Sequence, residues 1–405
     1  MKVFGTHQEN TLAQLADVAT RAERVALMAD GHLGYVMPIG GVAAYRNKVS
    51  VVGVGFDIAC GNCAIKTDLT LDDERIASSL TEIADEIQHT VSFGMGRTNK
   101  ADDAPTDHAL FDSEAWSLLP GSANIQNLQG KARAQLGTVG SGNHYVDVFA
   151  DETGAIWVGV HFGSRGLGHT IASGFLALSQ GEKWGARVPE KETLLSLDEP
   201  LGADYWALMN LAGEYAYAGR EWVARKTVEL LGGREVEMVH NHHNFAWKES
   251  HAVSDDDASD IEELIVVRKG ATPAFPGQKG FVGGSMGDDS VILEAADDAP
   301  EAQGAMYSTV HGAGRVMSRT EAAGKWDRKT KQLKSAGEVS QEMLDEWLAA
   351  KGVVLRGGGL DESPHAYRRL PDVLEAQGST INVLQTLTPL IVVMAGANEF
   401  DPYKD

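Results

Sequence analysis

Hydrophobic positions follow helical spacing in three segments of this chain. Residues 11–29 predict an amphipathic helix, and residues 204–231, rich in alanine, leucine and aromatic residues, predict a long one. Residues 70–88 predict a third helix with one apolar stripe, and Thr70 and Asp73 can form its capping box. The chain is therefore expected to contain substantial helix.

Strand signals lie in shorter segments between and after these helices. Apolar runs or alternating apolar positions predict strands at 49–56, 144–149, 156–161, 236–245 and 264–268. Several of these segments run directly into a loop that holds glycine together with histidine, arginine or asparagine. Candidate chemistry is therefore expected at strand ends.

Three other segments carry different signals. Residues 95–125 show little periodicity and are expected to be irregular, and Asp255–Asp257 are expected to form an exposed turn. The segment 381–394 is apolar on most faces and is expected to be buried. Pro389 would kink or break any helix there, so a helix followed by a short strand is an equal alternative.

The order of these elements favours an α+β fold, because strands and helices do not alternate steadily. The sequence shows no internal repeat and no linker rich in Pro, Ser or Gly. Loops with candidate chemistry extend from residue 30 to residue 315. We therefore expect residues 1–405 to form a single large domain of mixed β-sheets flanked by helices.

Composition narrows the class of protein. No segment approaches the roughly 20 apolar residues of a membrane span, and the N-terminal sequence lacks a signal-peptide pattern. Two cysteines in 405 residues give no disulfide framework, so we expect a cytoplasmic protein with no membrane partner. The net charge of −22 argues against binding nucleic acid by bulk electrostatics, so any such ligand would need a local arginine and metal site.

A carboxylate and a thiol are spaced to share one metal centre. Asp57 and Cys60 lie three residues apart in a tight turn, and a thiolate can bridge two cations. The alternative is a buried structural cysteine beside a turn aspartate. Cys60 and Cys63 also form a C-x-x-C pair, but without a second pair it does not define a zinc or redox site.

Three histidines strengthen the case for a metal centre. His144, His161 and His243 each lie where a predicted strand meets a loop, and such loops bring side chains of different strands together. Each alone is more simply a hydrogen-bonded core histidine. Together with Asp57 and Cys60 they form a donor set that suits Zn, Mn, Fe or Co, and ligand type alone favours zinc.

Glycine is enriched, at 45 of 405 residues, and gathers in three loops that suit an anion. They are 163–168 with Arg165, 283–287, and 308–315 with His311 and Arg315. Exposed backbone amides and arginine forks bind phosphate. His311 could attack a phosphorus while Arg315 and a metal spread the developing charge. The alternative is a glycine-rich turn with a solvated histidine.

Read together, these segments resemble the RtcB family of RNA-splicing ligases. The resemblance covers roughly residues 25 to 395, with the motifs in the family's order. The motifs are DGHLGYVMPIGGVAAY (30–45), VGVGFDIACG (52–61), LGTVGSGNHYVDV (136–148), HFGSRGLGH (161–169), HNHHNF (240–245), RKGATPA (268–274), GGSMG (283–287) and HGAGRVMSR (311–319).

The resemblance implies two manganese ions rather than zinc. By motif, Asp57 and His144 would hold one ion, and His161 and His243 the other. Cys60 would touch both ions. We follow the family here, because ligand type alone does not settle the metal.

The family's histidine ligand directly precedes an asparagine, which selects His243 over His240 and His242 as the metal ligand.

The resemblance also implies a GTP site. His311 would carry the guanylate. The nucleotide pocket would consist of Asn143, His144, His243, Asn244, Gly283, Gly284, Ser285, Met286, Ser290, His311, Gly312, Ala313 and Gly314, with Tyr367 over the nucleotide.

The implied reaction has three steps. His311 attacks GTP and keeps the GMP, a 2′,3′-cyclic phosphate end opens to a 3′-phosphate that takes the GMP, and a 5′-hydroxyl then displaces it. Arg165 and Arg315 would bind phosphates of the RNA ends. The role would be tRNA splicing or RNA repair, by a monomer or weak dimer.

Two positions depart from the family pattern. Ala395 stands where the family has a lysine that contacts the nucleotide, and Gly283 leads a loop that commonly begins with proline. A phosphohydrolase that opens cyclic phosphates and a non-catalytic module that binds RNA ends are the competing hypotheses. The donor set around Cys60 argues against the binding module, and His311 with Arg315 argues against the hydrolase.

Overall fold

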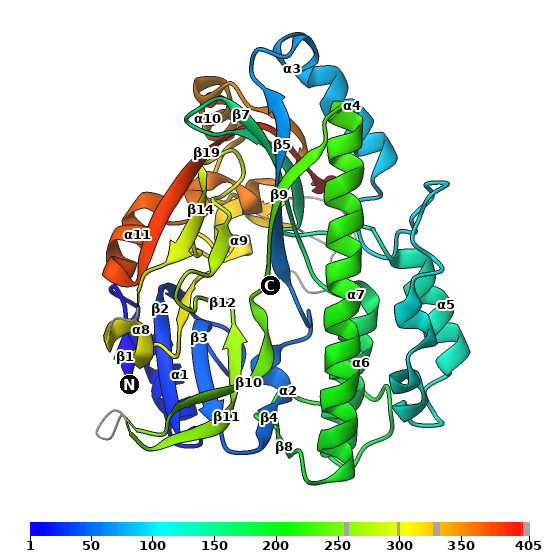
Figure 1. Ribbon diagram of the computed structural model, residues 1–405, viewed down its shortest axis with the longest axis vertical. Coiled ribbons are helices and arrows are strands. Elements are labelled where there is room, and N and C mark those ends of the chain that lie inside the picture. The colour runs from blue at the N-terminus through cyan, green and yellow to red at the C-terminus, as the bar shows by residue number, and fades with distance from the viewer. Residues whose placement is uncertain (255–258, 298–299, 327–332, 398, 400–405) are drawn as a thin grey trace.

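Two large β-sheets with helices outside them form the core of the molecule, an α+β arrangement as predicted (Figure 1). The computed structural model describes residues 1–254, 259–297, 300–326, 333–397 and 399. In Figure 1 the smaller sheet lies at the lower left and the larger sheet above it.

The smaller sheet has five strands. Only its first pair is parallel, and the other neighbours are antiparallel. In spatial order the strands are β1 (Lys2–Val3), β2 (Arg24–His32), β3 (Ile39–Tyr45), β11 (Ile261–Lys269) and β10 (Asn244–Ala252).

The larger sheet has eight strands. Seven form an antiparallel series: β13 (Lys279–Val282), β14 (Ser290–Ala295), β19 (Ile381–Gly396), β6 (Tyr145–Ala150), β7 (Ala155–Phe162), β5 (Gly61–Thr70) and β9 (Glu235–His242). The eighth, β18 (Val354–Gly358), pairs in parallel with β19. Three short pairs complete the strands: β4 (Lys48–Ser50) with β8 (Leu194–Ser196), β12 (Ala271–Pro273) with β15 (Ser308–Val310), and β16 (Lys325–Trp326) with β17 (Leu333–Ser335).

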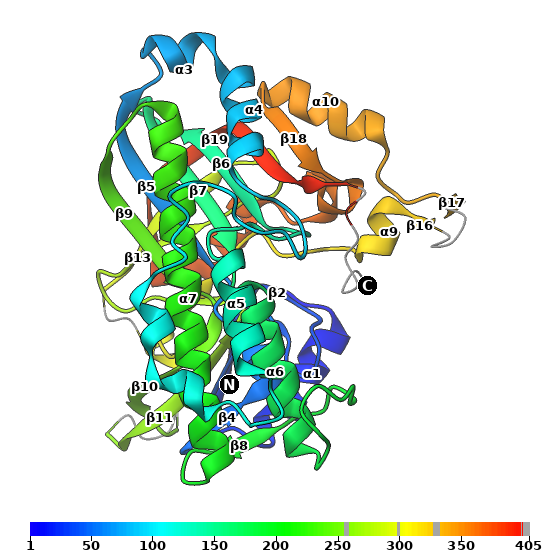
Figure 2. The same ribbon diagram turned by 90° about the vertical axis from the view of Figure 1, so that its right-hand side faces the viewer.

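Helix α7 (Pro200–Leu231) covers the larger sheet at β5 and β7, with α6 (Arg165–Ser179) and α5 (Ile125–Gln135) beside it (Figure 2). Proline at its start fits the first helical turn, and Gly232 ends it with a φ of 80° that suits glycine. In the described part of the chain, no helix has both the length and the apolar composition to cross a membrane.

The other helices are shorter. The α-helices are α1 (Glu9–Ala19), α2 (Val51–Val54), α3 (Glu74–Ser78), α4 (Leu80–Thr90), α5 (Ile125–Gln135), α6 (Arg165–Ser179), α8 (Pro300–Gly304), α9 (Arg319–Ala323), α10 (Gln341–Lys351) and α11 (Leu370–Gln377). The 3₁₀ turns are η1 (Ala109–Asp112), η2 (Glu114–Leu118), η3 (Leu360–Glu362), η4 (Pro364–Ala366) and η5 (Gly378–Thr380).

Two N-terminal predictions are wrong in part. The helix expected over 11–29 ends at Ala19, and β2 follows, because a strand buried on both faces has an apolar run that helical spacing can mimic. The strand expected at 49–56 stops at Ser50. The Ser50 hydroxyl then accepts a hydrogen bond from the Gly53 amide and caps the short helix α2.

Two further predictions also need correction. The helix expected over 70–88 is two helices, separated at Ser79, and Thr70 is the last residue of β5 rather than a cap. The segment 381–394 forms part of the single strand β19, so the helical alternative there is wrong. The expected burial is also wrong in part, because Val383 and Leu384 are exposed while Ile391 to Met394 are buried. Pro389 is accommodated where the register with β6 shifts.

The remaining strand and helix predictions are close to the structure. The strands expected at 144–149, 156–161 and 264–268 correspond to β6, β7 and β11, and the helix at 204–231 lies within α7. The expected strand at 236–245 is two strands, which meet at His243. Residues 95–125 are largely irregular apart from two 3₁₀ turns, and Asp255–Asp257 lie outside the described residues.

Candidate active site

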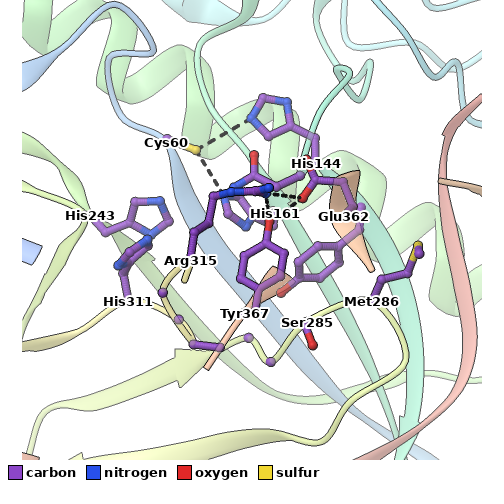
Figure 3. A pocket seen from close by; sticks show the side chains of 18 of the residues that line it. Cys60, His144, His161, His243, Ser285, Met286, His311, Arg315, Glu362 and Tyr367 are labelled. Carbon is purple, nitrogen blue, oxygen red and sulfur yellow. Dashed lines mark hydrogen bonds and ion pairs between the residues drawn. The ribbon is translucent and has the colours of Figure 1, made fainter. Parts of the chain in front are cut away.

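A pocket of about 270 Å³ collects nearly all of the predicted site residues (Figure 3). Every one of them lines it except Arg165, which lies behind His144 with its Nη1 3.3 Å from the Nδ1 of that ring. The prediction did not include nine other lining residues: His32, Ile39, Tyr145, Asp147, Gly270, Arg319, Glu362, Val392 and Met394.

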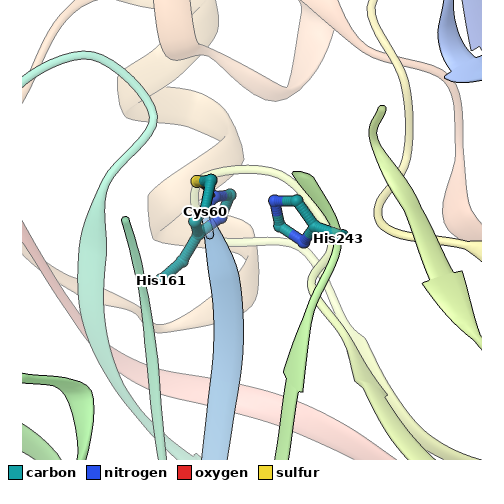
Figure 4. A group of neighbouring side chains, drawn as sticks. All are labelled: Cys60, His161 and His243. Atoms are coloured by element: carbon teal, nitrogen blue, oxygen red, sulfur yellow. Dashed lines mark hydrogen bonds between the residues drawn. The ribbon is translucent and has the colours of Figure 1, made fainter. Parts of the chain in front are cut away.

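Three adjacent strand ends bring the first group of possible ligands together (Figure 4). Cys60 directly precedes β5, His161 lies near the end of β7, and His243 directly follows β9. The registers pair Gly61 with Phe162 on one side and with His242 on the other. The three side chains therefore converge because the strands that carry them are hydrogen-bonded neighbours.

The ligand atoms of Cys60, His161 and His243 all lie within 4.8 Å of one another. The Cys60 Sγ is 3.1 Å from the Nε2 of His161. The neighbouring histidines His240 and His242 instead contact the guanidinium of Arg220. This spacing suits a single metal ion.

A second group shares the same thiol. The ligand atoms of Asp57, Cys60 and His144 also lie within 4.8 Å of one another. The His144 Nε2 is 3.1 Å from the Asp57 Oδ2 and 3.7 Å from the Cys60 Sγ. Gly163 leaves room for this arrangement, since a Cβ there would lie 2.2 Å from the Asp57 Oδ1. Cys60 thus belongs to both groups.

The ionisation of these groups suits cation binding. Burial lowers the pKa of both His161 and His243 well below 6.5, so each ring is neutral and offers a lone pair. Burial raises the pKa of Asp57, but its hydrogen bond to His144 and the charges of His144 and Arg165 outweigh burial and lower that pKa to about 2. Burial and the Asp57 charge raise the pKa of the Cys60 thiol, which a bound cation would reverse.

His311 lies beside the first group, with its ring centroid 4.9 Å from that of His243. The sequence analysis did not identify its partner, Asp30, although the DGHLG motif begins there. Asp30 is fully buried, and its Oδ2 lies 2.6 Å from the His311 Nδ1. The same oxygen accepts the backbone N–H of His311 at 2.9 Å. The carboxylate therefore holds the loop through a backbone hydrogen bond and lies against the ring, although its contact with Nδ1 does not have hydrogen-bond geometry.

The far part of the pocket holds buried polar atoms with open hydrogen-bonding capacity. The Tyr145 hydroxyl, the Asp147 Oδ1 and the Ser285 hydroxyl have no hydrogen-bond partner among the described residues. Burial raises the pKa of Asp147 well above its usual value. Strand periodicity could have found Asp147, because it follows Tyr145 on the same face of β6. A ligand with N–H groups would satisfy these atoms.

Arg315 enters the pocket on a loop and is held by polar contacts. Its Nη1 donates to the Tyr367 hydroxyl at 2.8 Å and lies 3.4 Å from Glu362, and its Nη2 donates to the Asp361 carbonyl at 2.8 Å. Arg319, which the sequence analysis also missed, binds the same two acidic residues. The cationic side of the pocket is therefore a network rather than a single arginine.

An α+β fold that gathers a shared thiol, a carboxylate and three imidazoles beside a glycine-lined pocket defines a candidate metal-dependent enzyme. The family model described as tRNA-splicing ligase RtcB matches residues 11–395. The chain therefore belongs to the RtcB family.

Individual relatives agree with this assignment. The chain is 32% identical to the tRNA-splicing ligase RtcB of Aeropyrum pernix, over 92% of this chain and 89% of the relative. It is 30% identical to the tRNA-splicing ligase RtcB of Thermococcus kodakarensis, over 95% and 90%. It is also 30% identical to the RNA-splicing ligase RtcB of Escherichia coli, over 92% and 90%.

Proposed function

We propose that this chain is an RNA ligase that joins 2′,3′-cyclic phosphate or 3′-phosphate ends to 5′-hydroxyl ends, in tRNA splicing or RNA repair. Membership of the RtcB family and the names of its relatives support the ligase class. The observation that carries the proposal is the position of Cys60, which is shared by two ligand groups, one of which includes His243 beside His311.

The donor set fits two divalent cations. Asp57 and His144 would hold one ion, His161 and His243 the other, and Cys60 both. We propose manganese on the basis of family membership, since the ligand chemistry alone also suits zinc. Bound there, the two cations would neutralise phosphate charge and favour in-line displacement.

His311 is the proposed nucleophile. The Asp30 carboxylate beside Nδ1 favours a proton on that nitrogen, which leaves the lone pair of Nε2 free to attack. Nε2 would form a bond to the α-phosphorus of GTP while the bond to the pyrophosphate oxygen breaks. The product would be a histidine–GMP phosphoramidate.

The buried position of Asp147 supports the proposal that the pocket binds a guanine base. Burial alone favours the neutral form of its carboxyl group, but the N1–H and the exocyclic amine of guanine, a donor pair that adenine lacks, could stabilise the carboxylate by donating to it. Because Ala395 replaces the family's lysine, base recognition here would depend more on Asp147. The remaining nucleotide contacts would come from Asn143, His144, His243, Asn244, Gly283, Gly284, Ser285, Met286, Ser290, Gly312, Ala313, Gly314 and Tyr367.

The joining steps would use the RNA ends themselves. Water would open the cyclic phosphate to a 3′-phosphate, whose oxygen would attack the phosphorus of the histidine-bound GMP and break the N–P bond. A 5′-hydroxyl would then attack the 3′-phosphorus and release GMP as the phosphodiester forms. Arg165 and Arg315 would bind phosphates of the ends. A cytoplasmic monomer or weak dimer stays a prediction.

Incubation with Mn²⁺ and α-labelled GTP tests this proposal. Wild type is expected to acquire acid-labile label, and His311→Ala to acquire none. His89→Ala, which changes an exposed histidine on α4, is the matched control and should label normally. Absence of label on wild type, or full labelling of His311→Ala, would contradict the proposal, and ATP in place of GTP measures base preference.

A further inference from the structure

Arg220 is a fully buried residue of α7 that reaches three strand ends at once. Its Nη1 donates to the backbone carbonyls of Ala59 at 2.8 Å and Phe162 at 2.6 Å. Its Nη2 donates to the His242 Nδ1 at 2.8 Å. One guanidinium thus ties together the chain entering β5, the end of β7 and the end of β9.

The residues that Arg220 contacts are the immediate chain neighbours of Cys60, His161 and His243. These three are the members of one candidate metal group. Gly61 lies over the guanidinium, since a Cβ there would be 3.1 Å from the Arg220 Cζ. Arg220 therefore lies directly behind this group, on the side of α7, and itself supplies no ligand atom.

The backbone at this point needs such support. Ala59 has a φ of 60°, a left-handed conformation that is uncommon for a residue with a Cβ and that persists only where its surroundings hold it. Its N–H donates to the Asn244 carbonyl at 2.7 Å, and its carbonyl accepts from Arg220. A fourth bond, from the Arg220 Nε to the His240 Nε2 at 2.8 Å, fixes the direction of the guanidinium plane.

The other candidate metal group is supported differently. The His144 Nδ1 lies 3.3 Å from Arg165 on α6, and Asp57 packs against Gly163. Of the ligands in that group, only Cys60 follows a residue that Arg220 contacts. Loss of Arg220 should therefore affect the metal affinity of the two groups unequally.

We propose that Arg220 is a positioning residue that sets the geometry of Cys60, His161 and His243 for one of the two ions. The proposal rests on the two-ion function proposed above. It adds that binding of the ion held by Cys60, His161 and His243 depends on Arg220 of α7. Residues that orient metal ligands through hydrogen bonds commonly change metal affinity about 10- to 100-fold when they are altered. Loss of Arg220 should therefore weaken binding of this ion by about that factor, and weaken the other ion, which shares only Cys60 with this group, by a smaller factor.

Co²⁺ titration of the metal-free, full-length protein tests this inference. Wild type should bind two ions and develop thiolate-to-Co²⁺ absorption. Arg220→Lys and Arg220→Gln should retain one tight ion, with a spectrum like that of His161→Ala and unlike that of Asp57→Ala. Unfolding of the metal-free variants, followed by circular dichroism, measures their stability separately.

Arg268→Lys is the matched control. Arg268 is equally buried and donates to the Ser308 hydroxyl and the Met306 carbonyl, both at 2.8 Å, but it contacts no neighbour of a candidate ligand. The Arg268→Lys variant should be less stable than wild type and still bind two ions. If neither Arg220 variant folds, His242→Phe is tested instead. It removes one hydrogen-bond acceptor of Arg220 while the arginine remains, and the affinity for the same ion should decrease.

The outcomes separate the two proposals. Two tight ions in the Arg220 variants, or in His242→Phe if only that variant folds, would overturn the positioning role. Equal weakening of both ions would also overturn it, because that result indicates general destabilisation. Failure of wild type to bind two ions would instead overturn the proposed metal function itself.

Discussion

The two halves of the pocket are built in different ways. Cys60, His161 and His243 stand at the ends of neighbouring strands, where paired registers fix their separation. The other half, which would hold the nucleotide under the proposed function, includes two loops, 283–286 and 311–315. There, position depends on side-chain contacts such as that between Arg315 and Tyr367.

Because of this difference, the two halves should differ in how well they tolerate substitutions. A change at a strand end moves a side chain whose neighbours are fixed by the sheet, so little adjustment can compensate. A loop can be re-supported by other contacts. Of the two positions that the sequence analysis set apart from the family pattern, Gly283 lines the pocket and Ala395 directly follows the lining residue Met394, whereas the five candidate ligands lie in motifs that match the family.

The largest expected effect is at the shared thiol. Cys60→Ala removes a ligand from both groups, so both ions should bind at least about 100-fold more weakly, which metal analysis of the purified protein would measure. Cys63→Ala is the matched control, because Cys63 is equally buried in β5 and belongs to neither group. Full metal occupancy in Cys60→Ala would contradict the role of this thiol as a shared ligand. The distinction drawn above between the two halves of the pocket would then fail.

An intermediate effect is expected at Asp30. In Asp30→Asn an amide would favour the other tautomer of His311 and leave Nε2 protonated, so guanylylation should slow by about 10³-fold or more. Metal content should stay at two ions. Asp151→Asn alters an equally buried aspartate that binds Thr153 and Trp157 away from the pocket, and it should label at the normal rate. Normal labelling of Asp30→Asn would contradict this role.

The smallest expected effect is at Asp147, a strand residue in the half of the pocket that would hold the nucleotide. Wild type should prefer GTP to inosine triphosphate, which lacks the exocyclic amine, and Asp147→Asn should reduce that preference by about 10-fold, as for loss of one charged hydrogen bond. Initial labelling rates with the two nucleotides measure it. An unchanged preference would place base recognition elsewhere in the pocket.

Short polar motifs at strand ends were the most informative part of the sequence. They identified residues such as Cys60 and His243, which the structure brings together in the pocket. Apolar spacing was less reliable, because β2, which is buried, and β19, which is buried mainly in its second half, are long strands whose apolar runs resemble helices. That residues 1–405 form one domain stays a prediction.

Arg220 illustrates what sequence alone could not supply. It lies in a long helix with ordinary helical composition, and nothing in its neighbours along the chain distinguishes it from a surface arginine. Its role appears only when α7 packs on the sheet and the guanidinium meets Ala59 and Phe162. Asp30 was missed for a similar reason, since 281 residues separate it from His311.

The wide separation of the pocket residues along the chain has a consequence for synthesis. The ligand residues from Asp57 to His243 leave the ribosome before His311, and Met394, which also lines the pocket, follows near the end. β19, which completes the centre of the larger sheet, is also synthesised late. A nascent chain therefore carries all five candidate ligands before position 311 is made, and the pocket can close only after residue 394 has been synthesised.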